Sequence, residues 1–176
     1  DALTTEQQAY WSRLSSVNAT SGVVHPLVHT HPLSNHSSVW LHLGMTGAVI
    51  LKEPDEDLFR LLDEEELRLL CHQYNDLLNT GFDDGYAIEF EYETNDCAFI
   101  DNLAVAHRAA PQAHLPAKEQ GLRIMHRSTT RANEMLMPNF GLPIQLDIYS
   151  PSPLGEGVWQ SGGIGFRWDD HARMRN

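Results

Sequence analysis

The segment from Tyr86 to Glu93 constrains the fold most strongly, because apolar and acidic side chains alternate along it. Its apolar side chains fall on one face and its glutamates on the other, which is typical of a strand with one buried face. Thr94–Asp96 has the composition of a turn, and Cys97–Ile100 reads as a more buried returning strand. The pattern predicts a β-hairpin.

The clearest helix begins near Asp63, which is a suitable N-cap residue. Glu66 stands where a capping box needs its reciprocal acceptor. From Leu67 to Leu78 the apolar residues follow helical spacing and form one stripe, and Asn79–Gly81 ends the helix. We expect this helix to pack against a core and to carry no chemistry.

Shorter elements are expected before this helix. They are a helix within Thr5–Leu14, a strand over Val23–Thr30, a returning strand over Val39–Leu43 and a short apolar run at Ala48–Leu51.

Two more strands are expected late in the chain, at Leu122–Thr130 and Ile144–Tyr149, before an irregular tail. Many strands and one long helix, without alternation of strand and helix, predict a mainly β fold with helical decoration. An antiparallel sandwich or barrel satisfies that description.

Composition narrows the class of function. The 176 residues suffice for one domain with a core, and the net charge of −12 argues against nucleic acid as a partner. No apolar run is long enough to span a membrane. Cys71 and Cys97 lie in apolar contexts, and as free thiols they favour a reducing compartment, so a cytoplasmic location is expected. The residues do not fix the oligomeric state, and a homo-oligomer stays open.

The candidate chemistry lies downstream of the hairpin. The returning strand ends in Asp101 and Asn102, and His107 follows five residues after Asn102. A histidine after a strand is a candidate metal ligand, although such a residue is more often structural. Asp101 and Asn102 can accept or donate a hydrogen bond that fixes the orientation of an imidazole ring.

Two arginines follow on the next expected strand. With a period of two, Arg123 and Arg127 share one face and lie about 13 Å apart, which is too far for both to bind one small carboxylate. The pair suits two separate anionic groups, because a guanidinium binds a carboxylate or sulfonate bidentately. The competing interpretation is that they pair with the chain's own acids.

Three motifs together resemble the taurine dioxygenase family of iron(II)/2-oxoglutarate enzymes. They are H-P-L-V-H-T-H-P at residues 25–32, F-I-D-N-L-A-V-A-H-R-A at 99–109 and R-I-M-H-R at 123–127. The resemblance runs in order from about residue 5 to about residue 131. It implies a double-stranded β-helix, or jelly roll, over residues 1–133, with residues 134–176 as an extension of the same domain.

The resemblance also implies roles for single residues. His107 is then an iron(II) ligand, Arg123 binds the distal carboxylate of 2-oxoglutarate, and Arg127 contacts an anionic group of the substrate in the catalytic site. Asp101 and Asn102 support His107. The reactants are a small molecule and molecular oxygen. This interpretation requires the ring of His107 and the guanidinium of Arg123 to point into one barrel mouth.

One part of the family pattern is missing. The metal site of the family needs an H-x-D or H-x-E triplet before the H-P strand, and none of the ten histidines begins one. We therefore expect an incomplete jelly roll, the C-terminal part of a longer dioxygenase. The alternative is an inactive jelly-roll module for binding or assembly.

Other interpretations are weaker. His29 and His31 form an H-x-H pair that could join His107 in a three-histidine metal site. A serine hydrolase lacks its G-x-S-x-G turn, and the glycines of the tail lack the context of a dinucleotide-binding loop.

Overall fold

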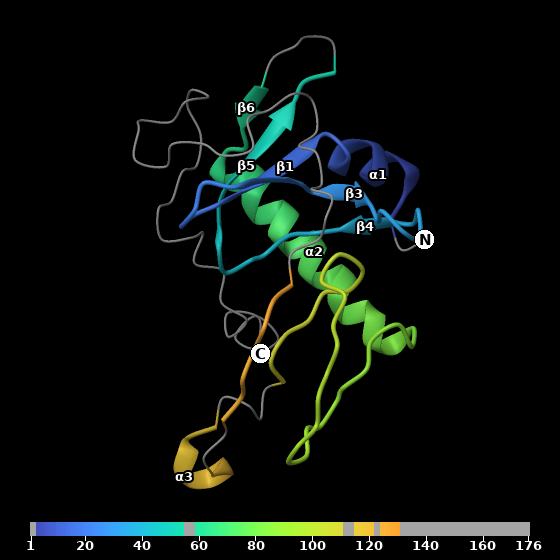
Figure 1. Cartoon of the computed structure of the whole chain (residues 1–176). Coiled ribbons are helices and arrows are strands. Elements are labelled where there is room, and N and C mark those ends of the chain that lie inside the picture. The colour runs from blue at the N-terminus through green and yellow to red at the C-terminus, as the bar shows by residue number, and fades with distance from the viewer. Residues whose placement is uncertain (1–2, 55–58, 111–114, 122–123, 131–176) are drawn as a thin grey trace.

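The computed structural model describes residues 3–54, 59–110, 115–121 and 124–130 (Figure 1). In these ranges the chain forms six strands and three helices. In chain order they are α1 (Thr5–Trp11), β1 (Leu14–Asn18), β2 (Val24–Pro26), β3 (Val28–Thr30), β4 (Ser37–Val39), β5 (Thr46–Lys52), β6 (Phe59–Leu61), α2 (Glu64–Asp83) and α3 (Ala117–Gln120).

The strands build two antiparallel sheets. The larger has the order β2-β1-β5-β6, with Ser16 of β1 opposite His25 of β2 and Val49 of β5. The smaller consists of β3 and β4, paired with Val28 opposite Val39. In β5 every residue but the last is buried, as expected for an inner strand with both faces covered.

The two sheets meet at Leu27, between β2 and β3. Its N–H donates to the carbonyl of Leu14 in β1 (2.9 Å), and its carbonyl accepts from the N–H of Trp40 after β4 (2.8 Å). The expected single strand over Val23–Thr30 is therefore divided, and its second half pairs in another sheet. Leu27 is itself fully buried, so the crossing point is part of the core.

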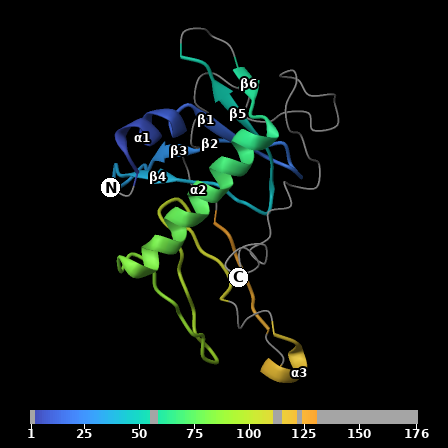
Figure 2. The same cartoon turned by 180° about the vertical axis from the view of Figure 1, so that it is seen from behind.

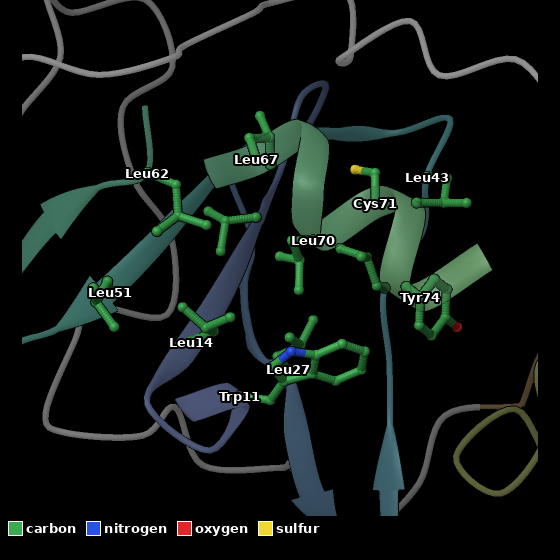
Figure 3. Packing of buried hydrophobic residues seen from close by; sticks show 12 residues of the cluster. Trp11, Leu14, Leu27, Leu43, Leu51, Leu62, Leu67, Leu70, Cys71 and Tyr74 are labelled. Atoms are coloured by element: carbon green, nitrogen blue, oxygen red, sulfur yellow. The ribbon is translucent and has the colours of Figure 1, made fainter. Parts of the chain in front are cut away.

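Helix α2 packs its apolar stripe against the sheets and supplies one side of the main core (Figures 1, 2 and 3). Burial of each large aliphatic side chain here stabilises the fold by about 1.5–3 kcal/mol. The core consists of Trp11, Leu14, Leu27, Leu41, Leu43, Val49, Leu51, Leu62, Leu67, Leu70, Cys71 and Tyr74.

The start of α2 agrees with the prediction in detail. Asp63 accepts from the N–H of Glu66 (2.9 Å), and the carboxylate of Glu66 accepts from the N–H of Asp63 (3.0 Å). Arg60 binds the same Glu66 through both terminal nitrogens and also binds Glu53. The hydrogen bonds from Arg60 lower the pKa of Glu66. The helix continues to Asp83, past its predicted end at Asn79–Gly81.

The predicted hairpin is wrong as a pair of strands. Thr94 and Asn95 form the expected turn, with Asn95 at φ 77° and the N–H of Glu93 bonded to Asp96. Neither arm forms a strand ladder with the described residues, and Ile88 is 84% and Phe99 96% exposed. A strand needs a partner for its backbone groups, and alternation of side chains alone cannot supply one.

The strands predicted nearer the C-terminus are also not found among the described residues. Residues 124–130 form no strand, and their side chains are exposed, contrary to the expected strand over Leu122–Thr130. The expected strand Ile144–Tyr149, the tail and the domain boundary at residue 133 lie outside the described residues. Both cysteines are free, but Cys97 is exposed, whereas Cys71 is buried.

Candidate functional site

The centre of the candidate site is the contact between strand β3 and the loop that begins at Asp101. His29 and His31 are two residues apart, and both rings are directed to this loop. The ring of His29 bonds through Nε2 to the carbonyl of Leu103 (3.0 Å), and that of His31 bonds through Nε2 to Asp101 (2.9 Å). Both histidines are only 6% exposed.

The partners of His31 fix its protonation pattern. Its Nδ1 accepts from the N–H groups of Leu33 (3.2 Å) and Ser34 (3.1 Å), so this nitrogen carries no proton. The proton of the neutral ring therefore sits on Nε2, which donates to Oδ2 of Asp101. One imidazole thus binds the turn after β3 and the loop at Asp101.

Asp101 organises the loop that follows it. Its Oδ1 accepts from the N–H of Leu103 (3.0 Å), and its backbone carbonyl accepts from Ala104 and Val105 (3.1 Å each). The bond from the Leu103 N–H, followed by that from the His31 ring, lowers the pKa of the carboxyl. The carboxylate is the stable form near neutral pH.

A cavity of about 250 Å³ lies beside this contact. The ring centroids of His25 and Trp40 are 4.5 Å apart, and burial lowers the pKa of His25. Because Nε2 of His29 donates to a carbonyl, its Nδ1 is an acceptor, and it has no hydrogen-bond partner within the described part of the chain. The lining residues are His25, Pro26, His29, Trp40, Asn102 and Leu103.

The structure brings only some of the predicted site residues together. Asp101 and Asn102 lie beside β3, Asp101 on the ring of His31 and Asn102 in the cavity wall. His107 and Arg127 are exposed on irregular segments, and Arg123 lies outside the described residues. The expected barrel mouth around His107 is not formed by the described residues, and the roles of these three side chains stay predictions.

The contacts of His29 and His31 with the loop were not predicted. The sequence offered one signal, an H-x-H pair on a single strand face, which we weighed only as a pair of metal ligands. Their hydrogen bonds in the structure go to protein atoms. The imidazole ring that Asp101 binds in the structure is that of His31. The support that Asp101 was expected to give to His107 stays a prediction.

The described residues do not fit a metal site by themselves. Among them no group of three His, Cys, Asp or Glu side chains could hold a metal ion. The three-histidine alternative is therefore not formed in this part of the chain. Within the same ranges, none of the helices has the length and apolar character needed to cross a membrane.

Comparison with known families defines the class of protein. The model of the family "Taurine catabolism dioxygenase TauD, TfdA family" matches residues 1–129. The match includes all three motifs, and the chain belongs to this family of iron(II)/2-oxoglutarate dioxygenases. The fold is accordingly mainly β with helical decoration, of the jelly-roll type. No solved structure matches the chain.

Proposed function

We propose that this chain is the C-terminal part of an iron(II)/2-oxoglutarate-dependent oxygenase that acts on a C–H bond of a small substrate. The observation that carries the proposal is the family match through residue 129, which includes both F-I-D-N-L-A-V-A-H-R-A and R-I-M-H-R. Oxygen is the second reactant, and a cytoplasmic location is part of the proposal.

His107 is proposed as one iron ligand. The other histidine and the carboxylate of a facial triad would come from residues that precede this chain, since no H-x-D or H-x-E triplet occurs in it. The many exposed apolar side chains between Tyr86 and Val105 support this proposal, because the rest of a jelly roll would cover them.

Arg123 and Arg127 are proposed to bind anions. Arg123 would anchor the distal carboxylate of 2-oxoglutarate, and Arg127 an anionic group of the substrate. A guanidinium suits both tasks, since its planar fork donates two parallel hydrogen bonds and stays charged. The oxidising power belongs to the iron and the cosubstrate, and the residues of this chain would set position and access.

The second candidate is an inactive jelly-roll module for binding or assembly. It is favoured by the missing triplet and by the lack of a three-residue metal group among the described residues. The two candidates differ in one measurable property, the binding of iron(II) together with 2-oxoglutarate.

The test is an anaerobic titration of the complete native protein with iron(II) and 2-oxoglutarate, followed by visible absorption. A weak charge-transfer band is expected, and its absence would favour the inactive module. Arg123→Ala should weaken 2-oxoglutarate binding roughly 10- to 100-fold and leave iron(II) binding unchanged. Arg68→Ala, at an exposed position of α2, is the matched control. Unchanged 2-oxoglutarate affinity in Arg123→Ala would contradict the assignment of that residue.

A further inference from the structure

We propose that His31 is a positioning residue, a neutral imidazole clamp that holds the loop from Asp101 to Val105 and thereby limits where His107 can lie. The clamp itself rests on contacts in the structure. Its consequence for a metal ligand rests on the function proposed above.

The first half of the clamp is the turn after β3. The N–H groups of Leu33 and Ser34 both point to Nδ1 of His31, and the N–H of His31 donates to the carbonyl of His36 (2.8 Å). The ring is therefore fixed at its near side by two backbone N–H groups of its own turn, and the backbone of His31 is held by a third bond of that turn. A buried ring held in this way has little freedom to rotate.

The second half is the loop. Nε2 of His31 reaches Oδ2 of Asp101, while the other oxygen and the backbone carbonyl of Asp101 close a tight turn over Leu103, Ala104 and Val105. His29 binds the same turn at the carbonyl of Leu103. The ring of His29 on β3 and the ring of His31, directly after β3, thus attach the loop at two points, and the loop cannot swing about a single bond.

The clamp limits His107 because the chain between them is short. His107 is two residues beyond Val105, so its Cα lies within roughly 7 Å of the anchored turn. Arg108 provides a further restraint on the other side, since its guanidinium lies over the ring of Phe82 in α2 with 5.7 Å to the centroid. A ligand histidine must be held near its productive position, and the clamp supplies such a restraint.

An imidazole suits this position because it presents an acceptor and a donor on opposite sides of one rigid ring. Asparagine can place an acceptor near the position of Nδ1, and glutamine can place a donor near that of Nε2. His31→Asn should therefore keep the turn and lose the loop. His31→Gln should keep the loop and lose the turn.

The direct test is NMR of the 176-residue chain with ¹⁵N-labelled histidine, together with amide hydrogen exchange. His31 should show an unprotonated Nδ1 and a protonated Nε2. In His31→Asn, exchange at Leu103, Ala104 and Val105 should accelerate about tenfold or more while Leu33 and Ser34 stay protected. His31→Gln should give the reverse pattern.

Two further variants complete the test. Asp101→Asn should accelerate exchange in the loop alone, and His36→Asn, an exposed histidine of the same turn, should change neither segment. A proton on Nδ1 of His31, or unchanged loop exchange in both His31→Asn and Asp101→Asn, would overturn the clamp.

The consequence for His107 is tested in the complete native protein under conditions where every variant is folded. The iron(II) dissociation constant should rise about tenfold in His31→Asn and return toward the wild-type value in His31→Gln. Altered loop exchange with unaltered iron(II) affinity would reject the positioning role. A wild-type protein that binds no iron(II) would instead reject the proposed function, and the exchange data would still decide whether the clamp exists.

Discussion

Nε2 of His31 lies 2.9 Å from Oδ2 of Asp101 and joins the residue directly after strand β3 to a loop 70 residues later in the chain. This bond, with that from His29 to Leu103, connects the well-packed first part of the fold to a segment whose side chains are largely exposed. The loop that leads to His107 therefore takes its position from β3.

The bonds of Asp101 predict a pH dependence of stability. Its folded pKa is lowered, first by the N–H of Leu103 and then by the His31 ring. The carboxylate thus adds stability above the unfolded pKa of about 3.9, and this contribution is lost as the pH falls through the folded pKa. Urea unfolding should show Asp101→Asn less stable than the wild type at neutral pH, with the difference shrinking near pH 3. A difference that grows on acidification would contradict the assignment.

The core predicts a strong contrast between two adjacent leucines of α2. Leu70 is buried in the main cluster, whereas Leu69 is 57% exposed. Leu70→Ala should lower the free energy of unfolding by about 2–5 kcal/mol, and Leu69→Ala should change it by less than about 0.5 kcal/mol. Chemical denaturation followed by circular dichroism measures both. Similar values for the two variants would show that α2 packs with a different face.

The capping box of α2 predicts a local effect. Asp63→Ala removes the side chain that accepts from the N–H of Glu66, and should cost about 1 kcal/mol of unfolding free energy. Asp76→Ala, at an exposed position within the same helix, serves as the control and should have a much smaller effect. Equal losses in the two variants would mean that helix propensity or net charge, and not the cap, accounts for the change.

The two cysteines should differ in reactivity. Burial raises the pKa of the Cys71 thiol to about 12, so it stays protonated and shielded near neutral pH, while Cys97 is exposed. A thiol reagent should modify one cysteine in the native chain and both in urea. Cys97→Ser should abolish the native reaction. Rapid labelling of Cys71 in the folded Cys97→Ser variant would show that α2 is not docked.

The sequence predicted best what depends on nearby residues. Asp63 and Glu66 mark the start of α2 because both halves of a capping box lie within three residues. The turn at Thr94–Asn95 was also predicted from its own composition. The strand predicted over Tyr86–Glu93 is not formed with the described residues, because a strand exists only if another strand accepts its hydrogen bonds. The alternation of apolar and acidic side chains indicates which face of a strand would be buried, but not whether a partner strand is present.

In the candidate site, too, features set by nearby residues were predicted and contacts between distant residues were not. The motifs around Asp101 and His107 identified the family, which the family comparison confirmed over residues 1–129. The partnership of His31 with Asp101 was not predicted, because nothing in either local sequence specifies a contact 70 residues away. The placement of Arg123 lies outside the described residues, so its role rests on the motif alone.

Leu27 fixes the register of β3, the strand that carries His29 and leads to His31. Because its N–H belongs to the ladder of β1 and its carbonyl to the residue after β4, a shift of one residue in β2 would displace β3 by the same step. Such a shift would turn His29 and His31 to the opposite face and release the loop at Asp101. Errors in the pairing of β2 with β1, at the edge of the larger sheet, would thus be transmitted to the approach to His107, although no side chain of that sheet has to touch it.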